Sequence, residues 1–471
     1  MIRTQLAKGI LFPLLLVVAC ASCGDGDETG DEDGGAADSG GAADSGGAAD
    51  SGEQDAAMDG GGDTDIDSDT DTDTDTDTDT DTDTDADGDS DASADAGDAG
   101  PQCVPGTIPS GPRVAVLLVQ WGMPGELWLI DLSDMSLVDT CIRTSTDVDL
   151  FHINSTLYIL ERDLWVASPF SRVHAFDADD LEHLWTTDLA PSANPQEILE
   201  HNGLLYVTQN GLDSIVILDA ANGNTSASSI DLSQHGIDGG ITGPDGLALN
   251  PDEPVDAGTL FVAVQNLNGA DFTPSGQSRV VAVNLATDDR KEIALSTQNP
   301  YGSFHKINGS LYVFCTGVFS EEDGALEKFS PDYPLPDASV SVITEQDMNI
   351  TTINDWTLTS HNGGFLTGDH GNPMTLPDGG TPTGPEWGRF MHMDVDAGTS
   401  SVIADGGVWS FKRVIQVPAS DGGIDSDEIW MIDTTFGSEG IRVFDAETAA
   451  EKPASMIQGF NAPPAVFVYL P

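Results

Sequence analysis

Basic residues are scarce in this sequence. Only 16 of its 471 residues are Lys or Arg, against 80 Asp and Glu, and the formal net charge is -64. A chain with so negative a field repels phosphate-rich polymers. The composition therefore argues against nucleic acid as a partner and against an anionic substrate. Cationic ligands, divalent metal ions and basic peptides remain compatible with it.

Several catalytic motifs are missing as well. The sequence has no G-x-S-x-G nucleophile elbow, no H-E-x-x-H zinc motif, no phosphate-binding Gly loop and no Cys-x-x-Cys-His haem site. Long helical periodicity is also missing. From Arg113 onward, Gly and Pro punctuate short β-rich segments, which predicts an all-β domain.

The N-terminal apolar run is too short to span a bilayer, which needs about 20 residues. It extends from Gly9 to Ala19 with Pro13 inside it, and Arg3 and Lys8 precede it. This pattern predicts an export signal. Its end, Val17-Val18-Ala19-Cys20, resembles the lipobox of bacterial lipoproteins, and the resemblance implies that Cys20 carries a lipid anchor.

Two alternatives to this anchor stay open. Cys23, preceded by Ala21-Ser22, could take the lipid instead, or the segment could be an ordinary secretory signal. In some bacteria the residues after the lipidated Cys act as a sorting signal. Ala21-Ser22 after Cys20 resembles a signal for delivery to the outer membrane, whereas Gly24-Asp25 after Cys23 resembles a signal for retention in the inner membrane. We expect an exported protein anchored to the cell envelope, at the outer membrane or the cell surface.

A low-complexity segment of Asp, Thr, Gly, Ala and Ser follows. Between Gly24 and Gly100 it holds 29 acidic residues and no Lys or Arg, which leaves 51 acidic and 14 basic residues for 101–471. Without large apolar residues to bury, it cannot offset its conformational entropy and should be disordered. The expected division is a signal peptide (1–20), a linker (21–100) and a folded domain (101–471).

Part of the linker matches the first half of a calcium-binding loop. Segment 83–89 reads D-x-D-x-D-G-D, with oxygen donors at Asp83, Asp85, Asp87 and Asp89. Ala94 stands where such a loop needs its bidentate Glu. The pattern therefore predicts weak cation binding, and calcium is the one cofactor that the sequence suggests.

Export places the remaining thiols in an oxidising compartment. Cys103 lies just before the first repeat described below and Cys141 lies late in it, so the two could form a disulfide, although the sequence leaves the pairing open. Cys315 lies in an apolar strand and is expected to be a buried thiol.

A repeated unit fills the domain. Strands meet at turns such as Asn202-Gly203, Asn308-Gly309 and Asn362-Gly363, and Asn-Gly supplies the positive φ of a tight hairpin. Spacings of 42 to 65 residues between units suit four-stranded blades with insertions, so the repeat predicts a seven-bladed β-propeller. Seven third strands end at an Asp or a near equivalent: Asp131, Asp177, Asp219, Asn284, Ser330, Asp394 and Asp445.

The two ends of this domain are complementary. The first unit opens with 114–119, which matches second strands elsewhere, and the chain ends with 462–470, which matches an inner strand. The C-terminal strand should therefore complete the first blade, and closing the ring removes exposed sheet edges. Segments 205–210 (Leu-Tyr-Val-Thr-Gln-Asn) and 214–219 resemble the YVTN-type β-propeller repeat. That resemblance implies a lactonase-like or quinoprotein-like propeller.

A site is expected at one end of the ring axis. Long insertions at 162–171, 266–278 and 368–388 join second to third strands, which places them at the end where inner strands begin. Carboxylates and aromatics there could hold a cation or a sugar, or they could satisfy backbone groups in the channel. The residues that enter the inner strands at this end are Asp147, Glu197, Asp245, Tyr301, Asp355, Trp356 and Trp409.

The histidines favour no shared metal site. His201 and His361 precede hairpin turns at the opposite end of the ring, and their equivalent places in the repeat explain them. His370, near Asp369 and Glu386 in the third insertion, is less constrained by the repeat.

The sequence assigns no catalytic residue. We expect a monomeric, lipid-anchored protein whose propeller is a non-catalytic binding module for a protein, a glycan or a cation at the cell envelope. One alternative is a metal-dependent, lactonase-like hydrolase with axial carboxylates as ligands. Another is a scaffold in an envelope complex, which would need no pocket.

Overall fold

The computed structural model describes most of the chain from Cys103 to Pro471. The export signal with Cys20 and Cys23, and the acidic linker, lie outside the described residues, as do Asp83, Asp85, Asp87 and Asp89. The described residues are 103–119, 124–145, 147–162, 171–250, 258–269, 273–318, 321–350, 359–369, 388–405, 411–419, 424, 426–434, 439–452 and 456–471.

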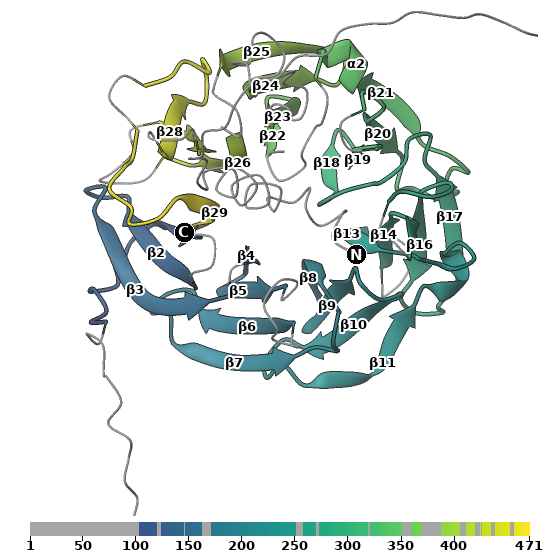
Figure 1. The fold of residues 1–471 in the computed structure, drawn as a ribbon, viewed down its shortest axis with the longest axis horizontal. Helices are drawn as coiled ribbons and strands as arrows, with labels where there is room; N and C mark the ends of the chain where they lie inside the picture. Colours follow the sequence, from purple (N-terminus) through teal and green to yellow (C-terminus); the bar gives the residue numbers. More distant parts are fainter. Residues whose placement is uncertain are drawn as a thin grey trace, which may run out of the picture. The chain divides into compact units, whose positions relative to one another are not determined.

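Seven antiparallel sheets stand around a central axis, as the view down that axis shows (Figure 1). The strands of the first three blades are given from the innermost outward. Blade 1 has β29 (Pro464–Leu470), β1 (Arg113–Leu118), β2 (Gly125–Asp131) and β3 (Leu137–Thr144). Blade 2 has β4 (Val148–Ile153), β5 (Thr156–Glu161), β6 (Arg172–Asp177) and β7 (His183–Asp188). Blade 3 has β8 (Pro195–His201), β9 (Leu204–Gln209), β10 (Ser214–Asp219) and β11 (Thr225–Asp231).

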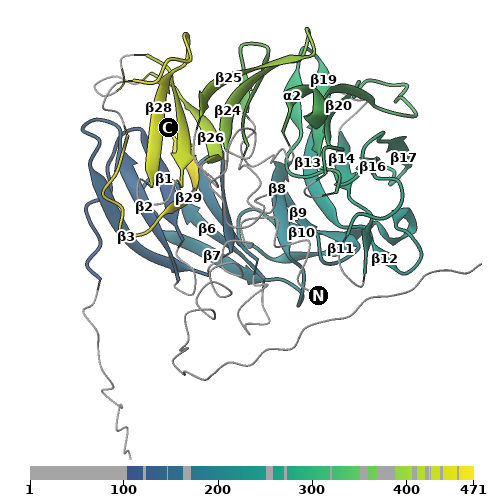
Figure 2. The same ribbon diagram turned by 45° about the horizontal axis from the view of Figure 1, so that its top comes forward.

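The remaining four blades continue the ring, and the tilted view shows neighbouring blades side by side (Figure 2). Blade 4 has β13 (Pro244–Asn250), β14 (Thr259–Val264), β16 (Arg279–Asn284) and β17 (Arg290–Ala294). Blade 5 has β18 (His305–Ile307), β19 (Ser310–Cys315), β20 (Ala325–Phe329) and β21 (Val340–Thr344). Blade 6 has β22 (Thr359–His361), β23 (Gly364–Asp369), β24 (Arg389–Asp394) and β25 (Thr399–Asp405). Blade 7 has β26 (Phe411–Val417), β27 (Glu428–Asp433) and β28 (Gly440–Asp445).

Short elements lie between the blades. The two-residue strands β12 (Gly240–Ile241) and β15 (Leu267–Asn268) pair with each other, and η2 (Ser233–His235) and α2 (Glu345–Met348) are single helical turns. Among the described residues, no helix has the length and apolar character needed to cross a membrane.

Turn chemistry explains why the repeat forms hairpins. Asn202 and Gly203 both have positive φ (53° and 77°), as do the Asn-Gly pairs at 308–309 and 362–363. At the end of the third strand, Asp219 Oδ1 accepts the N–H of Ala221 at 2.8 Å. The same acceptor geometry recurs in the other six blades, at Asp131, Asp177, Asn284, Ser330, Asp394 and Asp445. The aspartates at these positions are therefore turn residues.

The C-terminal strand closes the ring, which confirms the prediction from the sequence. In the β1–β29 register, Val114 pairs with Tyr469, Val116 with Phe467, and Leu117 with Val466. Blade 1 is therefore assembled from both ends of the described chain, and β1 is not left as an open edge.

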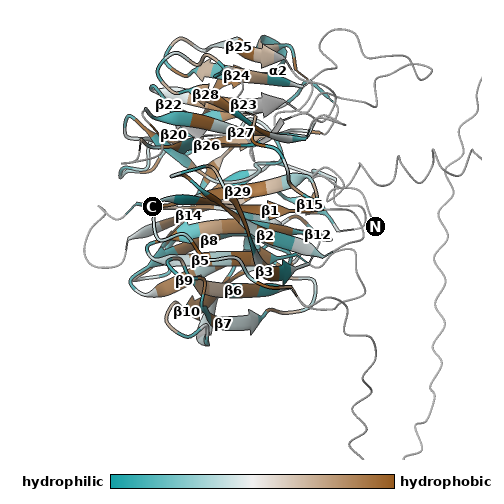
Figure 3. Cartoon of the chain, turned by 90° about the vertical axis from the view of Figure 1, so that its left-hand side faces the viewer, coloured by the Kyte–Doolittle hydropathy of each residue, from teal (hydrophilic) through white to brown (hydrophobic). Residues whose placement is uncertain are grey.

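The core lies between adjacent blades. One buried cluster joins Val116 of β1 to Trp430 of β27 and Phe467 of β29, so it holds blade 1 against blade 7. Another joins Tyr158 of β5 to Val207 of β9, between blades 2 and 3. Figure 3 shows hydrophobic colour along the strands that make these contacts. Because each sheet needs both neighbours to bury its faces, a single blade would not be stable alone.

Blade 7 differs from the four-stranded unit that the repeat predicts. Three strands are assigned to it in the described residues, and the chain that follows β28 returns beside it at two isolated bridges, Phe444–Glu451 and Ile441–Ile457. The outer edge of this blade is thus covered by an irregular segment. Blade 5 also departs from expectation, because its inner strand begins at His305, with only an isolated bridge at Pro300.

Truncating Phe467 should test the closure. Phe467 is 1% exposed, so the Phe467→Ala variant should lose about 3–5 kcal/mol of unfolding free energy through lost burial and a residual cavity. Leu184→Ala is the control: Leu184 is 48% exposed on the outer strand β7, and its loss should change stability by no more than about 0.5 kcal/mol. Urea denaturation of the two variants measures the difference. Equal small losses would contradict the closing role of β29.

Candidate functional site

The inner strands begin at one end of the ring, which we call the axial mouth. In four blades, the residue that follows the second strand donates its N–H to the segment that opens the inner strand. These pairs are Arg162 to Asp147 (2.8 Å), Asn210 to Asn194 (3.2 Å), Gln265 to Gly243 (3.3 Å) and Thr316 to Asn299 (3.0 Å).

Asn-Pro and Gly-Pro sequences shape this end of the blades. Asn194, Gly243 and Asn299 have φ values of 48°, 56° and 59°, in the left-handed region that Asn and Gly tolerate. The proline that follows each of them has no N–H to satisfy. Ser171 Oγ accepts the N–H of Asn194 (3.2 Å), and Ser278 Oγ accepts that of Asn299 (2.9 Å). These bonds tie third strands to inner strands.

Arg162 is a buried cation at the axial mouth. Its guanidinium donates to Asp147 Oδ1 (3.1 Å), Asp149 Oδ2 (3.1 Å) and Gln196 Oε1 (2.8 Å). Burial alone would lower the pKa of Arg162, but the negative charges of Asp147, Asp149 and Asp245 outweigh it and raise the pKa. Arg162 therefore stays charged and is balanced by carboxylates.

Asp149 joins blade 2 to blade 7. Its Oδ2 accepts from Arg162, and its Oδ1 accepts from Nη2 of Arg413 on β26 at 2.8 Å. The Asp149 side chain is buried, so an unpaired charge there would be strongly unfavourable. Two arginines from different blades balance that charge and hold the two inner strands together.

A chain of buried amides carries the network into blades 3 and 4. Gln196 donates to Asn194 Oδ1 (2.7 Å), Asn194 donates to Asn210 Oδ1 (3.1 Å), and Asn210 donates to Gln265 Oε1 (3.0 Å). Gln265 then donates to Asp245 Oδ2 (3.0 Å). Each of these side chains is buried. Connected donors and acceptors of this kind rigidify the region that they occupy.

Two carboxylates extend the network to blade 5. Asp245 Oδ1 accepts the N–H of Gly302 at 2.7 Å, and Glu197 Oε2 accepts from the hydroxyl of Ser303. Gly302 and Ser303 lie just before β18. The polar network defined here, from Arg413 through Arg162 and the amides to Asp245 and Glu197, thus links blades 7, 2, 3, 4 and 5; we call it the axial network.

The structure brings four of the predicted residues to the axial mouth. Asp147 and Glu197 are partly exposed there, whereas Asp245 and Tyr301 are buried. The other three predicted residues, Asp355, Trp356 and Trp409, lie outside the described residues, as does His370.

The cations and amides of the axial network are what the sequence reasoning missed. In the sequence, Arg162 marks only the edge of an insertion, and neither Arg413 nor Gln196 stands in a motif. The sequence does contain a signal for Arg162. Segment 101–471 has only 14 basic residues, and Arg162 is one of them; it directly follows β5, the strand that pairs with the strand of Asp149. An arginine in so acidic a domain points to a paired carboxylate.

The geometry of the axial network suits cross-linking. The oxygens of Asp147, Asp149 and Asp245 accept hydrogen bonds from arginine, amide or backbone donors. A metal ion at these carboxylates would have to displace Arg162 or an amide and overcome the positive charge of the guanidinium. Of the predicted residues, Asp245 satisfies a backbone group, the N–H of Gly302, whereas the side chains of Asp147 and Glu197 accept from the side chains of Arg162 and Ser303.

The histidines at the opposite, hairpin end have separate partners. His201 Nε2 lies 2.9 Å from Asn202 Nδ2, and His361 Nε2 lies 2.8 Å from Asn362 Nδ2. Burial lowers the pKa of His361, and the neighbouring His392 lowers it further. Each imidazole contacts the Asn of its own hairpin, which agrees with the explanation from the repeat.

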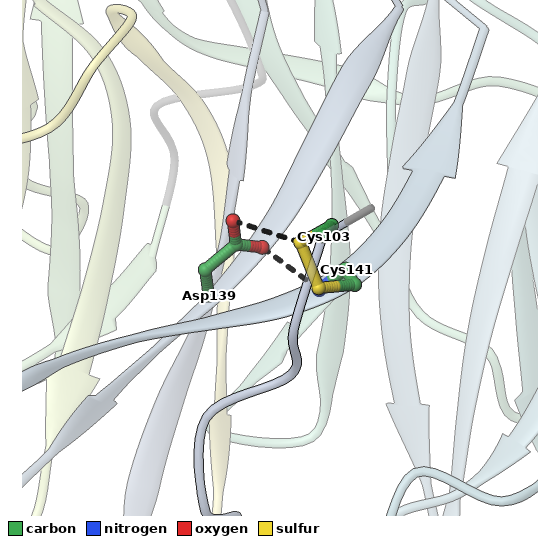
Figure 4. A group of neighbouring side chains, drawn as sticks. All are labelled: Cys103, Asp139 and Cys141. Atoms are coloured by element: carbon green, nitrogen blue, oxygen red, sulfur yellow. Dashed lines mark hydrogen bonds between the residues drawn. A yellow bond between two sulfur atoms is a disulfide. The ribbon is translucent and has the colours of Figure 1, made fainter. Parts of the chain in front are cut away.

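One trio of potential metal ligands converges in the described residues: Cys103, Asp139 and Cys141, with ligand atoms within 4.8 Å (Figure 4). A disulfide joins Cys103 to Cys141, and thiolates rather than disulfide sulfurs ligate metals. Asp139 accepts the N–H of Cys141 (2.8 Å) and pairs with Arg143 (3.2 Å). The trio is therefore a covalent staple between the start of the domain and β3. Cys315 is free, and burial raises its pKa well above the usual range.

Comparisons with known proteins give only distant likenesses. No protein-family model matches the chain, and no curated protein does. Similar solved structures include a proposed 6-phosphogluconolactonase from Bacteroides fragilis, at 12% identity and a TM-score of 0.47, over 78% of this chain and 100% of that chain. A protein from Lactobacillus plantarum has 14% identity and a TM-score of 0.48, over 76% and 99%. AztD from Citrobacter koseri has 15% identity and a TM-score of 0.40, over 76% and 98%.

At these identities and TM-scores the likeness carries no conclusion about function. The strand pairing itself establishes a seven-bladed β-propeller, and its structural neighbours include a lactonase-like protein. A shared fold does not transfer chemistry from one protein to another.

Removing the buried cation should test the axial network. Arg162→Met should lose about 3–5 kcal/mol of unfolding free energy, because the buried Asp149 side chain would lose one of its two arginine partners. Lys291→Met, which removes a surface ion pair with Asp337, is the control and should leave stability unchanged. Chemical denaturation at neutral pH compares the two. A stable Arg162→Met protein would show that the network does not hold the blades.

Proposed function

We propose that this chain is an exported lipoprotein whose seven-bladed propeller is a non-catalytic binding module at the cell envelope. The observation that carries the proposal is the axial network, in which carboxylates that could serve as metal ligands are used to join blades. A rigid ring of this kind presents loops without needing chemistry at its centre.

The N-terminal sequence supports the envelope location. A short apolar run ending at Cys20 provides the anchor, and the acidic segment 21–100 provides the distance between the anchor and the propeller. As a random coil, about 80 residues span on the order of 50 Å. The propeller could therefore reach partners beyond the membrane surface. Attachment would use two or three acyl chains on one cysteine, which hold a protein on a bilayer stably.

The axial mouth is the proposed binding face. The three longest connections between second and third strands leave the blades at this end, after Arg162, near Asn266 and after Asp369. Segment 101–471 carries 51 acidic and 14 basic residues, so its field attracts positively charged surfaces. We therefore favour an envelope protein with a basic surface as the partner, ahead of a glycan, and expect the propeller itself to be a monomer.

The lipid anchor can be tested with a matched pair of substitutions. Cys20→Ala should remove acylation and release the protein from the membrane fraction, whereas Cys23→Ala should leave both unchanged. Metabolic labelling with a fatty acid and fractionation of the cells measure the two effects. The reverse result would assign the anchor to Cys23, and membrane release by neither variant would contradict the lipoprotein proposal.

The non-catalytic role can be tested against the lactonase-like alternative. The purified full-length chain, supplied in turn with Ca²⁺, Mg²⁺, Mn²⁺ and Zn²⁺, should hydrolyse a panel of sugar lactones no faster than buffer. Asp245→Asn tests the axial carboxylates, and Asp219→Asn, at a turn of the hairpin end, is the control. Turnover that Asp245→Asn abolishes and Asp219→Asn preserves would overturn the proposal in favour of the hydrolase.

A further inference from the structure

Two histidines converge on the outer strands of blade 2, away from the axial mouth. His174 lies on β6 and His183 lies on β7, and His174 pairs in register with Thr186. His174 Nδ1 lies 2.9 Å from Thr186 Oγ1, and His183 Nε2 lies 2.7 Å from the same oxygen. One hydroxyl group thus occupies the point at which two imidazole nitrogens meet.

A buried carboxylate stands behind one of these rings. Glu161 Oε2 lies 3.3 Å from His174 Nε2, and Glu161 Oε1 accepts the N–H of Ser145 at 2.9 Å. Burial opposes the ionisation of Glu161, but the contacts with His174, Ser145 and Arg172 outweigh it and lower the pKa of this carboxyl. An ionised Glu161 favours the tautomer of His174 that carries its proton on Nε2, which leaves the lone pair of Nδ1 directed at Thr186.

Glu161 lies beside Nε2 of His174, the ring nitrogen that does not contact Thr186. A histidine ligand usually gives its other N–H to a carboxylate, which fixes the orientation of the ring and raises its basicity. The ring of His174 is also held by stacking on Phe176 (6.4 Å between centroids), and His183 packs edge-on against the same ring (5.4 Å). Both imidazoles are therefore positioned before any ligand arrives.

We propose that His174 Nδ1 and His183 Nε2 form a binding site for a divalent transition-metal ion such as Zn²⁺, in which the ion takes the place of the Thr186 hydroxyl. In the metal-free chain, Thr186 donates to His174 and accepts from His183. Binding needs Thr186 to rotate and the proton of His183 to move from Nε2 to Nδ1, so no net proton is lost. Water completes the coordination shell.

The donor set selects the class of ion. Imidazole nitrogen suits Zn²⁺, Cu²⁺ and Ni²⁺, whereas Ca²⁺ and Mg²⁺ prefer an all-oxygen shell. Arg172 and Asp188 form an ion pair at one end of the same two strands, so the local charge there is balanced. The side chain of His174 is 19% exposed, which gives an ion a route from solvent. The inference goes beyond the proposed function, because the site lies on the side of a blade.

The other histidine pair of the described chain lacks this geometry. The rings of His361 and His392 are 6.2 Å apart and perpendicular, and Nε2 of His361 is already paired with Asn362. In the part of the chain that the structure describes, neither ring pairs with a carboxylate. The convergence on Thr186 is what distinguishes the pair on blade 2.

Zn²⁺ titration of the full-length chain by calorimetry tests the site. Millimolar Ca²⁺ is kept in the buffer to occupy the acidic linker. His183→Asn and His174→Asn should each weaken Zn²⁺ binding by at least about tenfold, since even second-shell changes at metal sites cost 10–100-fold. His201→Asn, which alters an imidazole paired with its own hairpin Asn, should leave the affinity unchanged.

His183 is exposed, so its variant should keep the fold, and an unchanged melting temperature checks this. As a second readout, one equivalent of Cu²⁺ should give an electron paramagnetic resonance spectrum with two nitrogen donors, reduced to one in His183→Asn. The proposal would be overturned if the wild type, His174→Asn and His183→Asn all bound Zn²⁺ with equal affinity. A failure here would leave the lactonase assay and the anchor test unaffected.

Discussion

The pairing of β1 with β29 is the constraint on which the rest of the structure depends. Each blade buries its two faces only because another blade packs on either side. Blade 1 packs against blade 7 through a cluster that includes the C-terminal strand β29, which pairs with β1. The clusters between blades 1 and 7 and between blades 1 and 2 both include residues of β29, such as Phe467 and Val466. The closing strand is therefore shared by two interfaces.

The axis adds a second kind of constraint, which is electrostatic. In a domain with so few basic residues, Arg162 and Arg413 both donate to the buried carboxylate of Asp149. A chain of hydrogen-bonded amides continues from Arg162 to blade 4. Buried ion pairs contribute little net stability against an apolar alternative, but they are selective for one geometry. We infer that the axial network specifies how the inner strands are arranged, while burial between the blades supplies most of the stability.

Local rules explain how much of this could be predicted from the sequence. Asn-Gly hairpins, Asp at the ends of third strands and Asn-Pro before inner strands are short-range signals, so the seven units and the closure by β29 could be predicted. The axial network could not, because Asp149 reads as an ordinary strand residue and its partners Arg162 and Arg413 are 13 and 264 residues away. The convergence of His174 and His183 was missed for a similar reason, since it depends on a register shift between β6 and β7.

The disulfide between Cys103 and Cys141 has a mechanical consequence. The segment that enters the propeller begins at Cys103, which is bonded covalently to Cys141 on β3, the outermost strand of blade 1. The chain then continues to β1. A pull on the preceding chain would therefore be transmitted to β3, on the outer rim, and would bypass β1, whose hydrogen bonds with β29 lock the ring. An attachment of this kind would let the molecule withstand shear at a surface without being unzipped at its seam.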